Sequence, residues 1–174
     1  MTKIVLSANL IIEIPSKLLG IGGLSMKLST KGRYGVKAML DLALHNEEGP
    51  VALKSIAERQ YFSENYLEQL FASLRKAGLV KSIRGAQGGY ELAQSPQNIT
   101  IGSVLRALEG SLAPVECVGE DDHSKCSKSE QCVTRVIWEK IRDKVNEVVD
   151  SITLYDLIEE YKKYKDNNEY IYYI

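Results

Sequence analysis

The order of the periodic segments between residues 30 and 93 constrains this chain more than any single motif. Apolar residues recur at helical spacing from Thr30 until the sequence Glu-Glu-Gly-Pro at 47–50 stops the pattern. A short second helix is predicted around residues 53–57. A third is predicted over residues 63–77, with a serine as its N-cap and a glycine after its last turn. Three short helices are therefore expected in succession.

Two extended runs follow these helices and predict a β-hairpin. Residues 79–84 and 90–93 flank the glycine-rich sequence Gly-Ala-Gln-Gly-Gly at 85–89. Three helices followed by a hairpin, with a short link between the second and third helices, is the order of a winged helix-turn-helix. We expect a mainly α fold with one small β-hairpin, in which residues 26–110 form the winged helix-turn-helix domain.

The second half of the chain is predicted to hold a loop and a long helix. A short helix over residues 100–108 precedes a polar, cysteine-bearing loop at 111–132. From residue 133 a narrow apolar stripe repeats every three or four residues, at Ile137, Ile141, Val145, Val148 and Ile152. A narrow stripe suits a helix that pairs with its own copy. We therefore expect dimerisation helices at 133–162 and a polar, tyrosine-rich tail at 163–174.

Residues 1–25 show no clear amphipathic period, and we interpret them as a non-native or disordered extension. The codons of Gly22 and Gly23 can spell a purine-rich ribosome-binding sequence, and they lie at a suitable distance before a second possible start at Met26. A genuine flexible arm is the alternative. Mass spectrometry of the native protein decides between them, because a chain that begins at Met1 contradicts initiation at Met26.

Composition favours a cytoplasmic protein with a basic N-terminal half. Glu13 interrupts the richest apolar stretch, no run approaches the roughly 18 residues of a membrane span, and no signal-peptide pattern opens the sequence. The net charge is −1, but residues 26–93 carry ten Lys and Arg against seven Asp and Glu, whereas residues 94–174 carry ten against fifteen. A basic half has the sign expected of a phosphate-binding surface, and a solubilising charge pattern would look the same.

The third predicted helix and the hairpin carry side chains suited to DNA. The apolar residues of that helix face inward, which leaves polar side chains that can contact bases or phosphates on its outer side. An ordinary solvated helix face shows the same pattern, but Arg84 beside a turn without bulky side chains favours entry into a minor groove. The predicted DNA contacts are Lys31, Arg33, Ser63, Asn65, Tyr66, Glu68, Gln69, Arg75, Arg84 and Gln87, with Ser73 and Lys81 beside them.

Three cysteines, Cys117, Cys126 and Cys132, lie in the polar loop. An odd number of cysteines in a reducing compartment indicates thiols or metal ligands rather than a disulfide framework. Three thiolates suit an iron–sulfur cluster, which usually takes a fourth ligand, and His123 is the nearest one within the loop. Redox-sensing thiols without a metal, or a zinc site of the three cysteines and His123, fit the spacing as well.

Three motifs together carry a family likeness. They are Lys-Leu-Ser-Thr-Lys-Gly-Arg-Tyr at 27–34, Tyr-Leu-Glu-Gln-Leu at 66–70 and Ile-Arg-Gly-Ala-Gln-Gly-Gly-Tyr at 83–90. In this succession the chain resembles the Rrf2 family of bacterial regulators over about residues 26–160. The resemblance implies a dimeric winged-helix protein that binds promoter DNA, with repression as the expected mode of regulation.

The cysteine loop resembles the IscR type within that family, which binds a [2Fe–2S] cluster and controls genes of iron–sulfur cluster assembly. This resemblance implies that Cys117, Cys126 and Cys132 are the cluster ligands. The IscR pattern places a histidine three residues after the last cysteine, and Arg135 occupies that position here. The fourth ligand and the cluster type are therefore open.

Other stretches resemble the CymR type, which represses cysteine metabolism, namely residues 108–116, 141–143 and 150–154. Proteins of that type work with cysteine synthase, an enzyme that receives partner tails ending in isoleucine. Since this chain ends in Ile174, the resemblance implies docking of the Ile174 carboxylate in that enzyme's active site. A disordered or self-packed tail is the alternative.

The preferred interpretation is a dimer that pairs through the helix at 133–152. Its two 63–77 helices would enter successive major grooves of DNA. The state of a cluster in the cysteine-bearing loop would alter the DNA affinity of this dimer. An enzyme is not expected, because no Ser/His/Asp set, recognisable carboxylate pair or phosphate-binding glycine loop occurs. A protein-interaction module with a structural zinc loop is a further alternative, which salt-dependent promoter binding would exclude.

Overall fold

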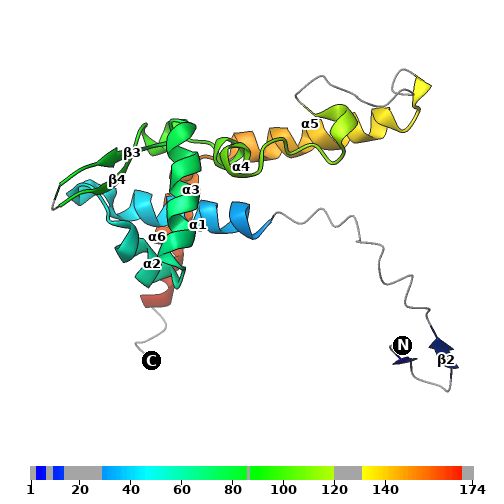
Figure 1. Ribbon diagram of the computed structural model, residues 1–174, viewed down its shortest axis with the longest axis horizontal. Helices are drawn as coiled ribbons and strands as arrows, with labels where there is room; N and C mark the ends of the chain where they lie inside the picture. The colour runs from blue at the N-terminus through cyan, green and yellow to red at the C-terminus, as the bar shows by residue number, and fades with distance from the viewer. Residues whose placement is uncertain (1–2, 7–9, 14–28, 86, 120–130, 170–174) are drawn as a thin grey trace.

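The computed structural model describes residues 3–6, 10–13, 29–85, 87–119 and 131–169 (Figure 1). Its helices are α1 (Thr30–His45), α2 (Leu53–Gln60), α3 (Glu64–Lys76), α4 (Ile101–Glu109), α5 (Arg135–Ser151) and α6 (Leu154–Glu169). Its strands form two antiparallel pairs, β1 (Lys3–Leu6) with β2 (Leu10–Glu13) and β3 (Val80–Ile83) with β4 (Gly89–Leu92). Short 3-10 turns are η2 (Asn46–Glu48), η3 (Pro96–Asn98) and η4 (Glu116–Val118). The predicted order of three helices and a hairpin is confirmed.

The core lies where α1, α2, α3 and α4 meet. Helix α3 buries the four residues of its predicted inward face, Leu67, Leu70, Phe71 and Leu74. Met39 and Leu42 of α1 and Ile56 of α2 are equally buried around them. Removal of this apolar surface from water is the main force that holds α3 in place, and it leaves the opposite face of the helix free.

The β3–β4 hairpin is attached to the helices at its base. Its paired residues are Val80 with Leu92, Lys81 with Glu91, Ser82 with Tyr90 and Ile83 with Gly89. Tyr90 and Val51 exchange two backbone hydrogen bonds of 2.8 and 2.9 Å, and the Tyr90 ring meets Phe71 of α3 edge-on at 4.8 Å. At the far end the chain turns through Gly85, whose φ of +127° favours glycine. The hairpin is thus a wing held against α3.

A buried carboxylate ties α1 to α2. Asp41 is 3% exposed and accepts hydrogen bonds from Arg59 Nη2 at 2.6 Å and from Gln60 Nε2 at 2.8 Å. A buried charge is costly unless it is paired and hydrogen-bonded, so this contact fixes the angle between the two helices. Tyr61, with a left-handed φ of +56°, then turns the chain toward α3.

Helix α3 begins after Ser63, the predicted N-cap. Ser63 has the extended backbone of a capping residue, with φ −70° and ψ 130°, but its hydroxyl makes no capping hydrogen bond. At α1 and α4 the equivalent side chains do make that bond, from the amide of Lys31 to Ser29 and from the amide of Ser103 to Thr100. The position predicted for the cap is therefore confirmed, whereas the side chain of Ser63 remains on the surface.

Helix α5 extends away from the core (Figure 1). It contacts α4 at one end and η4 along its side, and none of its residues is buried within the described chain. Among the described residues, none of the apolar stripe predicted for this helix is fully buried. No helix among the residues that the structure describes is long and apolar enough to cross a membrane.

Helix α6 returns to the core at Leu154, which is fully buried. The Leu154 amide donates to the Ile99 carbonyl at 2.8 Å, and the Ile101 amide donates to the Ile152 carbonyl at 2.8 Å. These reciprocal bonds join the α5–α6 corner to the start of α4.

The last helix is longer than the sequence predicts. Helix α6 continues to Glu169, although a polar tail was expected to begin at residue 163. Lys162 and Lys163 pair with glutamates one turn earlier, at 3.0 and 2.7 Å, which favours the helix although its residues there are polar.

Two strands lie within the first 25 residues, where the sequence indicated no regular element. Strands β1 and β2 pair in register from Lys3 opposite Glu13 to Leu6 opposite Leu10. This pairing does not bear on the start of translation, so initiation at Met26 stays a prediction.

Candidate DNA interface and cysteine segment

The outer face of α3 carries many of the residues predicted to contact DNA. The exposed ones are Ser63, Asn65, Glu68, Gln69 and Arg75, together with Arg84 and Gln87 in the wing. Figure 1 shows α3 at the surface, beside the β3–β4 wing. The carboxamides of Asn65 and Gln69 can pair with adenine edges, and the Glu68 carboxylate can accept from the cytosine amino group. The face therefore offers both donors and acceptors to base edges.

Tyr66 lies between this face and the core. Its half-buried ring meets Tyr34 edge-on at 6.0 Å, and Tyr34 stacks on Phe62 at 4.4 Å. The three rings pack the start of α3 against α1. The sequence pattern placed Tyr66 on the outer side, whereas the structure gives it a packing role. A DNA contact by Tyr66 stays a prediction.

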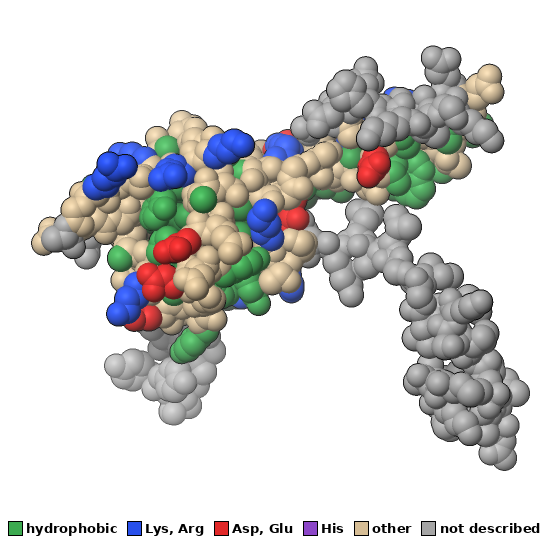
Figure 2. All heavy atoms as spheres, viewed as in Figure 1, with side chains coloured by type: hydrophobic (Ala, Val, Ile, Leu, Met, Phe, Trp, Pro, Cys, Tyr) green, Lys and Arg blue, Asp and Glu red, His purple; other side chains and the backbone are tan. Residues whose placement is uncertain are grey.

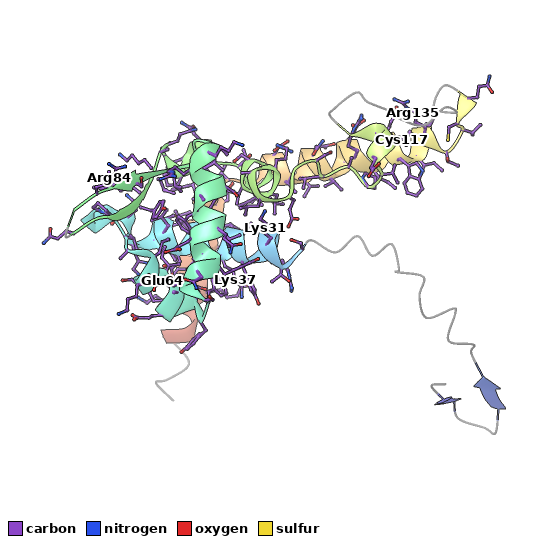
Figure 3. The ribbon with its side chains drawn as sticks, viewed as in Figure 1. Lys31, Lys37, Glu64, Arg84, Cys117 and Arg135 are labelled. Carbon is purple, nitrogen blue, oxygen red and sulfur yellow. The ribbon has the colours of Figure 1, made fainter. Side chains whose placement is uncertain are left out.

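Basic side chains gather over the wing and the adjoining end of α3, whereas acidic ones lie toward the other end of that helix (Figure 2). Arg75 Nη1 donates to the Ser82 hydroxyl at 3.4 Å and so links α3 to β3. Lys81 pairs with Glu91 across the hairpin at 2.8 Å, which partly neutralises its charge. Arg84 is exposed near the wing turn (Figure 3). This cationic edge suits a phosphate backbone.

The first turn of α1 presents the remaining predicted contacts, a half-buried Lys31 and an exposed Arg33. The Ser29 hydroxyl accepts from the Lys31 amide at 3.0 Å. The carboxylate of Glu109, the last residue of α4, accepts from the Gly32 amide at 2.7 Å and from the Ser29 hydroxyl. Glu109 could not be recognised from the sequence, because a contact across 77 residues leaves no local pattern.

Two of the three cysteines lie within the described residues. Cys117 belongs to η4, and both it and Cys132 are half-buried free thiols. The Thr134 hydroxyl, 3.1 Å from Cys132 Sγ, and the Arg135 amide hold the pKa of the Cys132 thiol below its ordinary value. Arg135 itself donates to Glu139 at 2.8 Å. Hydrogen bonding thus favours the thiolate, the form that binds metals.

The rest of the predicted ligand set falls outside the described residues. Cys126 and His123 lie in the segment 120–130, which the structure does not describe. Among the described residues, no group of three or more His, Cys, Asp and Glu side chains is close enough to hold a metal ion. The predicted three-cysteine site is therefore not tested by the structure.

The Cys117 turn is fastened to α5. Arg142 Nη1 donates to the Val118 carbonyl at 3.0 Å, and the Val118 side chain is 1% exposed. Arg142 also pairs with Asp143 at 2.7 Å. The sequence pattern did not reveal this contact either, since Arg142 resembles any other polar residue of the helix. The cysteine segment, residues 111–132, is thereby attached to the long helix next to Cys117.

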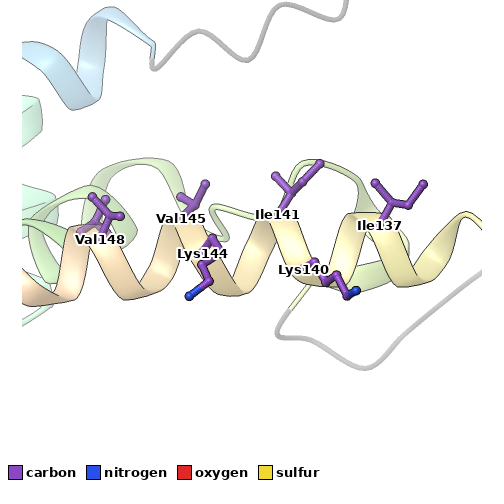
Figure 4. Close-up of a pocket in the computed structure, with 7 residues that line it drawn as sticks. Ile137, Lys140, Ile141, Lys144, Val145 and Val148 are labelled. Atoms are coloured by element: carbon purple, nitrogen blue, oxygen red, sulfur yellow. The ribbon is translucent and has the colours of Figure 1, made fainter.

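Helix α5 also carries an open apolar face. Figure 4 shows Ile137, Ile141, Val145 and Val148 projecting to one side of the helix, with Lys140 and Lys144 along the edge of that face. These residues and Val149 line a shallow groove, and the side chains of Ile137 and Val148 are 55% and 57% exposed. Apolar side chains in such a row usually mark a protein interface.

Comparisons with known proteins agree with this arrangement. The family model Rrf2, described as an iron-dependent transcriptional regulator, matches residues 28–160. CymR of Bacillus subtilis (strain 168), an HTH-type transcriptional regulator, is 49% identical over 151 residues, which cover 86% of this chain and 100% of that protein.

Solved structures give the same result. The structure of CymR (YrzC), the global cysteine regulator of B. subtilis, matches with a TM-score of 0.63 and 50% identity over 77% of this chain and 97% of that one. T. potens IscR matches with a TM-score of 0.63 and 53% identity over 80% of this chain and 90% of that one.

The family match spans the winged helix-turn-helix, the cysteine segment and α5. The relatives are named as transcriptional regulators of the CymR and IscR types, so this chain is a DNA-binding regulator and not an enzyme. The Rrf2 family model matches well over half of the chain, and the relatives align along most of their length. The protein therefore belongs to the Rrf2 family of transcriptional regulators.

Proposed function

We propose that this chain is a dimeric cytoplasmic repressor whose affinity for promoter DNA is controlled by an iron–sulfur cluster on Cys117, Cys126 and Cys132. The observation that carries the proposal is the attachment of the Cys117 turn to α5 through Arg142. Cys132 lies at the other end of the cysteine segment, three residues before α5 begins. A group held by both cysteines would therefore connect directly to the helix with the open apolar face.

The two described cysteines have suitable donor chemistry. Both are free thiols, and the surroundings of Cys132 favour its thiolate. Iron–sulfur clusters take thiolate ligands, and a bound cluster would supply a charge that depends on iron and redox state. The likeness to the IscR type favours a [2Fe–2S] cluster. Its fourth ligand stays open, with His123 as the nearest histidine in the sequence.

In this proposal, helix α3 and the wing bind the DNA. Helix α3 enters the major groove with Asn65, Glu68 and Gln69 at base edges, and Arg84 enters the neighbouring minor groove. Two copies joined through α5 place two such helices on a near-palindromic site. A cluster held by the three cysteines would alter the rigidity or spacing of this pair and thereby its DNA affinity. The regulated genes serve iron–sulfur cluster assembly or cysteine metabolism.

The test compares wild-type protein with the triple variant Cys117→Ala, Cys126→Ala, Cys132→Ala, both purified without oxygen. We expect visible charge-transfer bands, with iron and acid-labile sulfide, in the wild type only. We also expect different promoter affinities for cluster-loaded and cluster-free wild type. Equal affinities for every promoter tested would contradict the proposal. Zinc in place of iron would support the three-cysteine zinc site, and a metal-free protein whose affinity follows thiol oxidation would support a thiol sensor.

A cluster-free repressor of cysteine metabolism that acts with cysteine synthase is the second candidate. It is favoured by the 49% identity to CymR over the full length of that protein. The C-terminal Ile174, which lies outside the described residues, would dock in the enzyme's active site. Deletion of residues 172–174 should abolish binding to cysteine synthase and leave DNA binding by the regulator alone intact. Unchanged affinity of the truncated chain for the enzyme would disprove docking.

A further inference from the structure

We propose that Glu109 is a positioning residue for DNA binding, whose carboxylate holds the first turn of α1 so that Lys31 and Arg33 face the phosphate backbone. The inference deepens the proposed function, because it rests on the DNA contacts proposed for Lys31 and Arg33. Glu109 itself belongs to α4 and is not expected to contact DNA.

The carboxylate supplies what the start of α1 lacks. The first amides of a helix have no partner within the helix, and a negative charge near them is favourable. Helix α1 has no acidic residue in its own first turn. Ser29 accepts from the amide of Lys31, and Glu109 accepts from the next amide, that of Gly32, at 2.7 Å. Glu109 also accepts from the Ser29 hydroxyl, so one carboxylate fixes both the cap and the first turn.

The packing of α1 on α4 leaves room for this contact only because glycines occupy the crossing. A Cβ atom at Gly32 would lie 2.7 Å from Glu109 Oε1, and one at Gly35 would overlap the side chain of Leu108. Both glycines are buried. The backbone of α1 therefore comes close enough for the short side chain of Glu109 to reach a main-chain amide directly.

Glu109 lies directly before the cysteine-bearing part of the chain. Gly110, with φ +83°, ends α4, and the cysteine segment begins at the next residue. A displacement of that segment would act on α4 at the residue that holds the DNA-facing turn of α1. Glu109 therefore lies between the cysteine-bearing residues and the first turn of α1.

Charge and position predict opposite effects when Glu109 is replaced. A carboxylate beside DNA-facing cations repels phosphates, so removal of its charge alone would tighten DNA binding. If the carboxylate instead holds Lys31 and Arg33 in place, its removal weakens binding and reduces the salt dependence. Glu109→Ala and Glu109→Gln separate these effects, because both remove the charge and only glutamine keeps an oxygen that can accept from Gly32 and Ser29.

The experiment measures promoter binding against salt concentration for wild type and both variants. We expect Glu109→Ala to weaken binding about 10-fold and to lower the slope of log K against log salt by about one to two units, one for each lost phosphate contact. Glu109→Gln should stay within about twofold of wild type with an unchanged slope. Glu160→Gln, the same charge change on the exposed side of α6, is the control and should have no effect.

Equal slopes for Glu109→Ala and wild type, or tighter binding by both Glu109 variants, would overturn the proposal. Ser29→Ala removes the hydroxyl that donates to Glu109 and caps Lys31, while it leaves α4 and the bond from Gly32 to Glu109 in place. It should also lower the slope, so the test does not depend on the folding of one variant. Hydrogen exchange at the Gly32 amide should speed up in Glu109→Ala and not in Glu109→Gln, which tests the contact without DNA. A wild type without salt-dependent promoter binding would instead overturn the proposed function.

Discussion

At the scale of single residues, Tyr61 has a backbone conformation that lowers the stability of the fold. It has a left-handed φ of +56° and is 95% exposed, so its Cβ is strained and its ring gains little from burial. We expect Tyr61→Gly to raise the free energy of unfolding by about 0.5–1 kcal/mol, because glycine adopts this conformation without strain. Urea denaturation monitored by circular dichroism measures the change.

The control for this prediction is an exposed tyrosine in a regular helix. Tyr161 lies in α6 and is 47% exposed, and Tyr161→Gly should lower the stability by about 1 kcal/mol, since glycine is a poor helix former. Opposite signs for the two substitutions would establish the backbone origin of the effect. A loss of stability in Tyr61→Gly would show that the Tyr61 ring has a packing role.

The thiol of Cys132 gives a pH-dependent prediction at the same scale. The Thr134 hydroxyl and the Arg135 amide hold its pKa below the ordinary value, so the thiolate persists to lower pH than in a free cysteine. Thr134→Val should raise this pKa and move the midpoint of the alkylation rate to higher pH. The measurement uses metal-free protein with Cys117→Ser and Cys126→Ser, so that one thiol reacts. Identical profiles with and without Thr134 would contradict the assigned cause.

Residues with a local pattern could be predicted, and residues defined by distant contacts could not. The inward face of α3 was predicted because four apolar side chains share one side of a helix, and all four are buried. Glu109 and Arg142 were missed, since each acts on a backbone group far along the chain, at Gly32 and Val118. Tyr66 was placed outward from its helical position, and the aromatic packing against Tyr34 could not be anticipated from spacing.

At the scale of elements, the α1–α4 crossing should be sensitive to side-chain size. A Cβ atom at Gly35 would overlap Leu108, which is buried, so the helices would have to separate. Overpacking costs roughly 1–3 kcal/mol, whereas alanine favours a helix by about 1 kcal/mol over glycine, so we expect Gly35→Ala to destabilise the fold by a net of up to about 2 kcal/mol. Thermal unfolding gives the comparison. Lys37→Ala, at an exposed position of α1, should be nearly neutral, and a stabilised Gly35→Ala would contradict the close crossing.

The observed boundaries of helices and strands agree with the predicted ones where capping residues or helix-breaking residues mark them. Helix α1 ends at His45, just before the predicted stop at 47–50, and the wing turn falls within the glycine-rich sequence 85–89. The end of α6 was missed because its last turns are polar and carry no hydrophobic period. Ion pairs of Lys162 with Glu159 and of Lys163 with Glu160 favour a helix that continues across the predicted boundary.

At the scale of the whole molecule, the described chain is a winged helix-turn-helix with one helix extended into solvent. The core buries α1 to α4, whereas the apolar face of α5 stays open. An amphipathic helix of this length gains little stability alone, so a second copy of α5 is the partner that best fits its narrow stripe. The groove along Ile137, Ile141 and Val145 would then lie at the centre of the dimer.

Ile141→Glu tests this arrangement. A symmetric dimer would bury two such carboxylates without partners, and a penalty of roughly 3 kcal/mol weakens the dimer about 100-fold. We expect sedimentation velocity to show dimers for the wild type and monomers for the variant at micromolar concentration. Affinity for a two-half-site promoter should fall with the dimer, whereas affinity for a single half-site should hardly change.

The matched control is Glu147→Lys, because Glu147 lies on the exposed side of α5 and pairs with Lys144 at 2.5 Å. It alters a charge on the same helix without entering the apolar face, so the dimer should persist. If Ile141→Glu remained dimeric and bound the full promoter as tightly as the wild type, the copies would have to associate elsewhere. Control of DNA binding by the cysteine segment would then need a path other than α5, since the anchoring of Cys117 through Arg142 would no longer lead to the helix that sets the spacing of the two α3 helices.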